Sequence, residues 1–260
     1  MNQMGRGADG TVGKAIDVLE QVADFGRPVR FVEILERSGH PKTTLYRLLQ
    51  TLARQGMLRY DEASQTYAPG LRLVRLAHAA WQQSSLAPIA RPFLDDLSGS
   101  VGETIHLAQL DEGQVLYIDK RNAARPIDMF SAAGKVGPGY CTGVGKVMIA
   151  HLPEAEREAA ISKQSFYRHT AATLTDAADL KRELTQVRTD GVAFDREEHE
   201  PGIICIAAPI LARSGRVIGA LSITTSTQRN TIERLADRRP ALMETARKIA
   251  EAASTWQFPG

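Results

Sequence analysis

The sequence predicts an α+β protein with two domains joined by a helix. Three patterns support this prediction. Two short helical patterns separated by a break precede two short strands between residues 31 and 70. A helix with an apolar stripe follows over residues 71–83. From residue 84 onward, strands are interleaved with helices, which is the pattern of an α+β domain. A chain of 260 residues is long enough to bury two separate cores.

Composition excludes several classes of protein. The net charge is only +2, so any affinity for DNA must come from a local basic patch. The two cysteines, Cys141 and Cys205, cannot form a disulfide framework or a structural zinc site by themselves. The first ten residues lack the apolar core of a signal peptide, and no apolar run is long enough to span a bilayer. We therefore expect a cytoplasmic protein with reduced thiols.

In the amino-terminal third, residues 1–11 are expected to be a disordered leader. Helices are expected over residues 12–25, 31–37 and 42–54. Gly39 and Pro41 break the chain between the last two. Helical spacing gives the last helix an apolar stripe of leucines, Leu45, Leu48, Leu49 and Leu52. Its opposite face carries Lys42, Thr43, Thr44, Tyr46, Arg47, Gln50 and Arg54, and no acid occurs between Arg37 and Tyr60.

This basic, hydroxyl-rich face suits the major groove of DNA, because cations meet phosphates and short polar side chains reach base edges. An ordinary amphipathic surface helix is the alternative. Gln55–Gly56 ends the helix, and residues 57–60 and 65–68 predict two strands around a polar turn. Helix, turn, recognition helix and β-wing is the order of a winged helix-turn-helix. We therefore assign residues 1–70 to a DNA-binding domain.

Residues 71–84 predict a linker helix with a stripe made of Leu73, Leu76, Ala77, Ala80 and Trp81. This stripe can connect the domains, pair with a second subunit or pack only on its own domain. Residues 85–260 then form the second domain. Helices are expected over 87–97, 142–152, 176–190 (with Thr175 as the N-cap) and 232–253. Strands are expected over 103–110, 114–121, 127–131, 191–195, 202–211 and 217–224.

The most glycine-dense segment, residues 134–146, fails the tests for two phosphate-binding motifs. Tyr140 and Val147 occupy positions where a P-loop needs Gly and a hydroxyl residue, and Thr142 stands where a dinucleotide motif needs Gly. A glycine-rich loop entering a helix remains, and its free N–H groups can bind a small anion such as a carboxylate. A tight turn that packs the helix on the sheet is the alternative.

We expect no metal, cofactor or catalytic site. The run Asp195–Glu200 contains acids and His199, but a solvated charge run is the commoner explanation of such a segment. The other histidines, His40, His78, His106, His151 and His169, form no ligand spacing. Cys205 lies in an apolar strand, where a thiol is usually buried and inert. A thiol-dependent enzyme using Cys141 or Cys205 is kept as the rival hypothesis, and a nucleotide sensor is weakened by the failed motif tests.

At this point the sequence resembles the IclR family of bacterial transcriptional regulators over nearly its whole length. The resemblance rests on residues 13–20, 41–49, 67–70, 142–146, 190–202, 205–209 and 220–223. It implies a winged helix domain, a linker helix and a GAF-like domain that binds a small molecule. It also implies dimers or tetramers that bind near-palindromic operators as repressors or activators. Family effectors are often small carboxylates or aromatic catabolites.

Matched to the family's motifs, the effector pocket maps to Met129, Gly143, Val144, Asp195, Cys205, Ser222 and Thr224. Two departures from the family pattern, Tyr140–Thr142 and Val144, enlarge side chains near this pocket, so the effector's identity does not carry over. Backbone donors at Gly143 and Val144, with two hydroxyls, could hold a carboxylate between apolar walls. The sequence thus predicts an effector-gated DNA-binding regulator and no enzyme. Effector, operator, sign of regulation and choice of dimer or tetramer are not encoded in these motifs.

Overall fold

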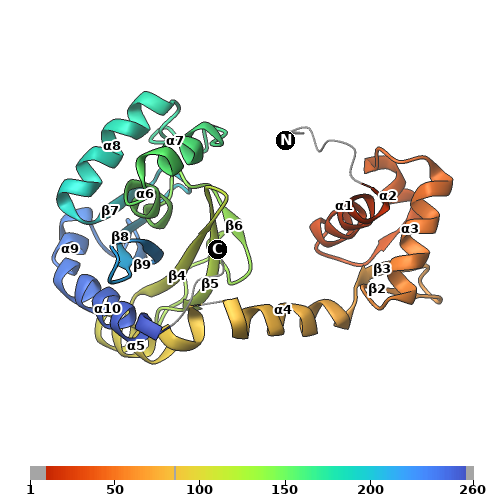
Figure 1. Cartoon of the computed structure of the whole chain (residues 1–260), viewed down its shortest axis with the longest axis horizontal. Coiled ribbons are helices and arrows are strands. Elements are labelled where there is room, and N and C mark those ends of the chain that lie inside the picture. The colour runs from red at the N-terminus through yellow and green to blue at the C-terminus, as the bar shows by residue number, and fades with distance from the viewer. Residues whose placement is uncertain (1–9, 85, 256–260) are drawn as a thin grey trace. The chain divides into compact units, whose positions relative to one another are not determined.

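The computed structural model describes residues 10–84 and 86–255 (Figure 1). The chain divides into two compact units, Met1–Gln83 and Ser84–Gly260, and each is treated by itself. Residues 1–9, most of the predicted leader, lie outside the described residues. Among the residues that are described, none belongs to a helix long and apolar enough to cross a membrane.

The amino-terminal unit has the predicted winged helix order. It contains α1 (Thr11–Asp24), β1 (Val29–Arg30), α2 (Phe31–Arg37), α3 (Lys42–Arg54), β2 (Leu58–Asp61), β3 (Thr66–Pro69) and α4 (Leu71–Ser84). The short strand β1 was not predicted. It pairs with β3 and extends the wing to an antiparallel sheet of order β1-β3-β2.

The core of this unit forms where the helical stripes meet. All four leucines of α3, Leu45, Leu48, Leu49 and Leu52, are buried together with Val18, Val22 and Ile34. Ile16 of α1 lies outside this core and is 48% exposed. In the stripe of α4, Leu76, Ala77 and Ala80 are exposed, whereas Leu73 and Trp81 are half-buried. Most of the stripe of α4 therefore remains exposed to solvent.

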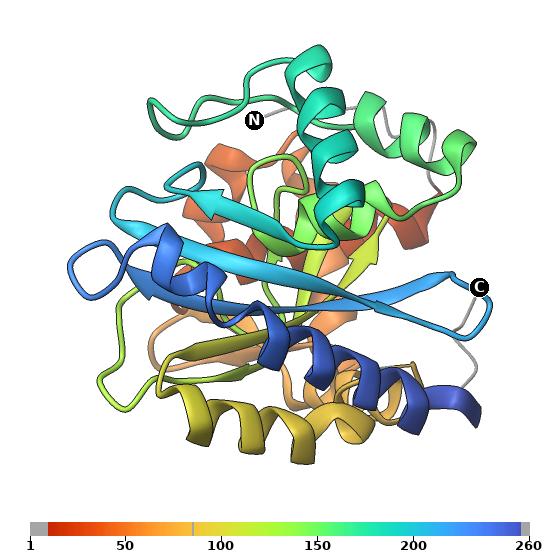
Figure 2. The same ribbon diagram turned by 90° about the vertical axis from the view of Figure 1, so that its left-hand side faces the viewer.

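The carboxy-terminal unit is built on a six-stranded antiparallel sheet of order β6-β5-β4-β9-β8-β7. The strands are β4 (Thr104–Asp111), β5 (Gln114–Arg121), β6 (Val136–Gly137), β7 (Ala193–Arg196), β8 (Ile203–Leu211) and β9 (Val217–Ser226). Helix α6 (Gly143–Ala150) packs on one face, with α7 (Glu154–Ser162) and α8 (Ala177–Asp190) against it. Helices α5 (Ala87–Val101) and α10 (Arg239–Ala252) cover the other face, as Figure 2 shows.

Three expectations for this unit were wrong. Residues 127–131 form no strand, because the segment is held by side chains, with the Phe130 N–H bonded to the Glu200 carboxylate. The closing helix is broken into α9 (Ile232–Ala236) and α10, with Pro240 in the first turn of the second, where its missing N–H costs no hydrogen bond. Asp176, not Thr175, is the N-cap of α8 and accepts the Asp179 N–H. Helix α7 was not predicted.

Helix α6 approaches the sheet closely because both surfaces are small. Gly143 and Gly145 lie in its first turn, and Ala108, Ala207 and Ala220 lie in the core beneath it. A Cβ at Gly145 would stand 2.6 Å from the Cα of Gly139, which is backbone that cannot move aside cheaply. The glycine-dense segment therefore leads into α6 and also allows this helix to pack closely on the sheet.

Replacing Gly145 with Ala tests this close approach. We expect the free energy of unfolding to fall by about 1–3 kcal/mol, because the added methyl must displace the Gly139 backbone. Urea denaturation measures the change. The matched control is Gly99→Ala in α5, where an added Cβ meets nothing within 4 Å. That substitution is expected to be neutral or stabilising by up to about 1 kcal/mol. Equal stability changes for the two variants would contradict the packing argument.

Candidate functional site

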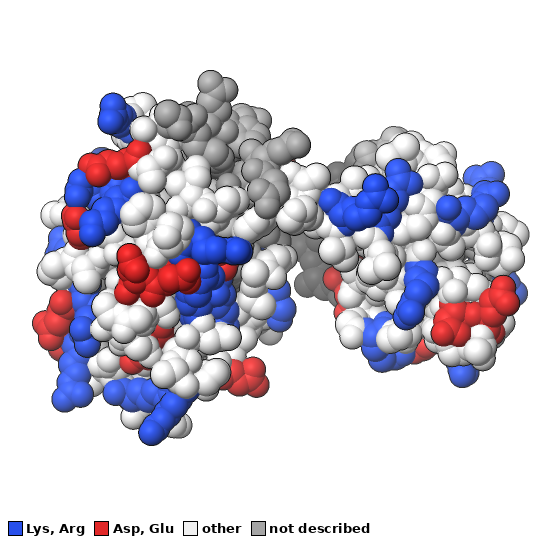
Figure 3. All heavy atoms as spheres, turned by 90° about the horizontal axis from the view of Figure 1, so that it is seen from below, with Lys and Arg blue, Asp and Glu red and all other residues white. Residues whose placement is uncertain are grey.

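The polar face of α3 is presented to solvent. Lys42, Thr43, Tyr46, Arg47 and Arg54 are exposed, whereas Thr44 and Gln50 are half-buried. The Gln50 amide lies 3.4 Å from the Tyr67 hydroxyl of the wing. Beside α3 runs a groove of about 580 Å³ whose walls include Lys42, Thr43 and Tyr46 from the helix and Tyr60, Gln65 and Tyr67 from the wing. On the face of the molecule in Figure 3, groups of Lys and Arg alternate with groups of Asp and Glu, so no single sign of charge covers this face.

In the carboxy-terminal unit, polar side chains form a row across four neighbouring strands. His106 of β4 lies opposite Ser222 of β9, and Thr224 of β9 lies opposite Cys205 of β8. Cys205 in turn lies opposite Asp195 of β7. All five side chains are buried. Sequence positions more than 100 residues apart are thus brought together beneath the amino end of α6.

A small cavity of about 30 Å³ lies between this row and α6. It is lined by all seven residues that the family resemblance indicated, Met129, Gly143, Val144, Asp195, Cys205, Ser222 and Thr224. Seven further residues also line it, His106, Tyr117, Ser131, Thr142, His199, Glu200 and Ile203. The cavity has room for roughly one or two water molecules.

His106 is the main residue of this site that sequence reasoning missed. Its Nε2 lies 2.8 Å from the Ser131 hydroxyl, and its Nδ1 lies 3.2 Å from Thr224 and 3.3 Å from Ser222. Burial lowers the pKa of His106 to about 3, so the imidazole is neutral. One sequence feature could have indicated it. His106 and Ala108 are two residues apart on one strand, so both side chains lie on the same face of the sheet, under α6.

The amino end of α6 is fitted to the Cys205 thiol. A Cβ on Gly143 would lie 2.6 Å from the sulfur, so only glycine suits this position. The Gly143 and Asp195 N–H groups hydrogen-bond the sulfur. Burial nevertheless raises the pKa of Cys205 to about 12, and it also raises the pKa of Cys141. Neither thiol is a ready nucleophile at neutral pH, which removes the basis of the rival enzyme hypothesis.

A buried ion-pair network stands behind the cavity. Lys146 of α6 is fully buried, and its Nζ lies 2.5 Å from Glu198 and 3.0 Å from Glu183 of α8. Although burial opposes its charge, these two carboxylates raise the pKa of Lys146. The Asp195 Oδ1 accepts the Glu198 N–H at 2.8 Å. Lys146 therefore ties α6 to the turn that positions Asp195.

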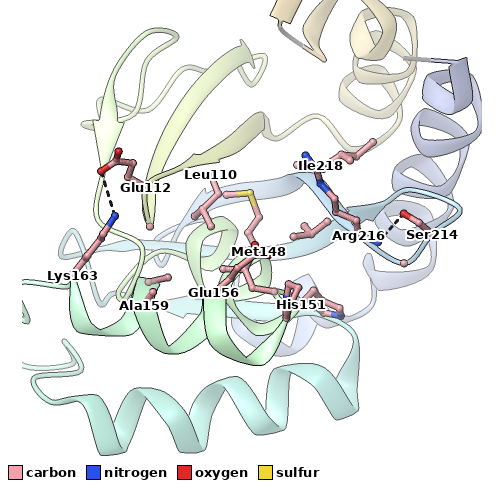
Figure 4. A pocket seen from close by; sticks show the side chains of 17 residues that line it. Leu110, Glu112, Met148, His151, Glu156, Ala159, Lys163, Ser214, Arg216 and Ile218 are labelled. Atoms are coloured by element: carbon pink, nitrogen blue, oxygen red, sulfur yellow. Dashed lines mark hydrogen bonds and ion pairs between the residues drawn. The ribbon is translucent and has the colours of Figure 1, made fainter. Parts of the chain in front are cut away.

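The same unit has a larger cleft of about 840 Å³ between α7 and the ends of two hairpins (Figure 4). Leu110, Met148 and Ile218 belong to its apolar lining. Its charged groups lie at the exposed rim, including the Glu112–Lys163 pair at 3.3 Å. None of the residues lining this cleft was predicted as a site residue, and none of them is a buried polar side chain.

Replacing Asp195 with Asn tests the burial of this carboxyl. Burial, reinforced by Glu198, raises the pKa of Asp195 from 3.8 to about 7. Between about pH 4 and pH 7 the folded protein therefore keeps a proton that the unfolded chain has lost. Wild-type stability must then fall as pH rises through this window. We expect the stability of D195N relative to wild type to increase by roughly 1 kcal/mol per pH unit from pH 5 to pH 7.

Urea unfolding at pH 5, 6, 7 and 8 measures this difference. Asp96→Asn is the control, because Asp96 is exposed on α5. A D195N-to-wild-type difference that is constant over this range would contradict the burial argument.

Comparisons with known proteins agree with this architecture. Residues 11–62 match the IclR helix-turn-helix domain, and residues 78–251 match the family described as bacterial transcriptional regulator IclR C-terminal. The chain is 34% identical over 249 residues to the HTH-type transcriptional regulator KdgR of Escherichia coli strain K12, which covers 96% of this chain and 94% of that protein.

Solved structures share the fold. The Thermotoga maritima IclR superimposes with a TM-score of 0.74 at 29% identity, covering 94% of this chain and 98% of that one. An IclR homologue from Microbacterium hydrocarbonoxydans, complexed with 4-hydroxybenzoate, gives a TM-score of 0.80 at 24% identity, covering 95% and 100%. The named relatives are transcription regulators rather than enzymes. The chain belongs to the IclR family of DNA-binding transcriptional regulators.

Proposed function

We propose that α3 binds operator DNA and that a small carboxylate or aromatic acid, held at the amino end of α6, modulates this binding. The observation that carries the effector site is the buried polar row beneath α6. Helix amino termini favour anions, because their N–H groups and the helix dipole point at the ligand. The Ser222 and Thr224 hydroxyls can donate to a carboxylate, and Val144 and Ile203 supply apolar wall.

The small cavity is the better candidate than the larger cleft for a chemical reason. Ligand specificity needs polar groups held in place within an apolar enclosure. The cavity has them in the hydrogen-bonded set His106, Ser222 and Thr224. The cleft has charged groups at its exposed rim, where salt and water screen them. We therefore place the effector in the cavity, in contact with the seven residues mapped from the family motifs.

An acid of several heavy atoms exceeds a cavity of about 30 Å³, so binding must move a wall. The segment Met129–Ser131 is the wall whose contacts can be exchanged. The Phe130 N–H donates to the Glu200 carboxylate at 3.0 Å, and Ser131 bonds both His106 and the Lys120 ammonium, each at 2.8 Å. Displacing this segment creates the second arrangement that a ligand must favour in order to regulate.

The proposed functions of the three parts of the chain follow the predicted domain boundaries. Residues 1–70 bind DNA, residues 71–84 link, and residues 85–260 bind the effector. On DNA, Thr43, Thr44, Tyr46, Arg47 and Gln50 face the groove. Lys42 and Arg54 contact phosphates.

The exposed apolar stripe of α4 suits a second subunit, in a dimer or a tetramer. A dimer would place its two recognition helices about 34 Å apart on a pseudo-palindrome. Operator DNA makes the cytoplasm the place of action.

Replacing Arg47 with Ala tests the DNA-binding role. Arg47 is exposed on α3, and an arginine that reads a base edge contributes about 1–3 kcal/mol to discrimination. We expect the variant to bind an operator duplex about tenfold to a hundredfold more weakly, with its thermal melt unchanged. Fluorescence anisotropy in matched salt measures the affinity, using a duplex selected from random-sequence DNA by the wild-type protein.

The control variant is Arg188→Ala, which removes the same charge from an exposed position on α8. It should leave operator affinity unchanged. An R47A protein that binds the selected duplex as tightly as wild type would remove α3 from the proposed role.

A further inference from the structure

The titratable groups that line the cavity beneath α6 include two carboxyl groups and two imidazoles. Two carboxyl groups line it, Asp195 and Glu200, and its lining, drawn from the described residues, includes no Lys or Arg. His106 supplies no cation, because burial keeps it neutral. A carboxylate ligand in this cavity would therefore meet like charge, which is costly where water is excluded.

The ion pairs behind the cavity do not relieve this excess. Lys146 is engaged by both Glu198 and Glu183, and Arg196 lies 3.4 Å from the same Glu183 oxygen. Two cations thus face two carboxylates before Asp195 is counted. The Asp195 carboxylate accepts a hydrogen bond from the backbone N–H of Glu198. Asp195 is therefore the carboxyl group in this network that has no cation of its own.

We propose that the effector acid binds together with one proton, and that this proton is held on Asp195. The inference rests on the proposed effector function. The proton comes from solvent, neutralises the Asp195 carboxylate and turns a repelling oxygen into an O–H donor toward the ligand carboxylate. No other bond is made or broken. Asp195 thereby selects ligands that accept a hydrogen bond at this position, and it makes effector affinity depend on pH.

The other titratable groups around Asp195 do not explain such a dependence, with one exception. Burial raises the pKa of Cys205 on β8 and of Tyr117 on β5, so both stay protonated at neutral pH. Although burial opposes charge, hydrogen bonds from His199 and the Phe130 N–H lower the pKa of Glu200. Lys146 of α6 and Glu183 of α8 stay charged in their ion pair.

The exception is His199, which lines the cavity with its Nδ1 3.6 Å from the Glu200 carboxylate. An imidazole that gains a proton as pH falls would also favour an anion. A control variant at His199 is therefore required to separate the two proton acceptors.

Calorimetric titration of the full-length protein tests the proposal. The probes are small aliphatic and aromatic acids that stay ionised between pH 6 and pH 8, 4-hydroxybenzoate among them, together with the corresponding uncharged amides. Titrations in buffers of different ionisation enthalpy count the protons taken up per ligand. The proteins are wild type, Asp195→Asn and His199→Gln. The amide of Asn still donates a hydrogen bond but does not titrate.

We expect wild type to bind an acid probe with uptake of about one proton at pH 8, and its Kd to rise about tenfold per pH unit above the Asp195 titration. His199→Gln should keep both properties. Asp195→Asn should bind the same acid with no proton uptake and with a Kd that changes less than about twofold between pH 6 and pH 8.

Three outcomes overturn the inference while leaving an effector site in place. They are acid binding without proton uptake, a pH dependence lost in His199→Gln but kept in Asp195→Asn, and binding of the amides alone. Failure of all acids and amides to bind at either pH is a different result. It removes the proposed effector function, and the inference with it.

Discussion

The close packing of α6 on the sheet is the constraint on which the effector domain depends. Glycines in the first turn let the helix start directly above Cys205, where a single added Cβ would collide with the sulfur. The same approach buries Lys146 completely and brings it to Glu198 and Glu183. An unpaired ammonium at this depth would be strongly destabilising, so the turn after β7 is fixed by the helix that it faces.

This arrangement gives one small volume two opposing electrostatic properties. The start of α6 lines the cavity with Thr142, Gly143 and Val144, so the positive end of the helix dipole lies beside it. The sheet beneath contributes Asp195, a buried acid for which the ion-pair network leaves no cation. An anion is attracted by the first and repelled by the second. In our proposal, protonation of Asp195 removes this repulsion, so that the affinity for an acid depends on pH.

Sequence reasoning identified most of the fold because its signals were local. The leucine stripe of α3, the turn residues of the wing and the apolar runs of β8 and β9 each indicate their own element. The site residues came from motif resemblance, and the structure gathers them around one cavity. The alternation of His106 with Ala108 indicates only which face of the sheet it lies on, and Lys146 carried no local signal for its ion pair. The roles of both residues depend on partners far along the chain, Ser131 and Glu198 among them. The strand predicted over residues 127–131 is absent for the same reason. The Phe130 N–H bonds the carboxylate of the distant Glu200 instead of a neighbouring strand.

We propose that ligand binding in the cavity and operator binding by α3 are thermodynamically linked. Operator affinity measured at pH 6 with and without a saturating acid, identified by calorimetry, tests it most directly. We expect a change of about 5-fold to 150-fold in operator Kd, with the acid's own Kd changing by the same factor when operator is saturating. An operator Kd that stays the same at acid concentrations that fill the cavity would contradict the account.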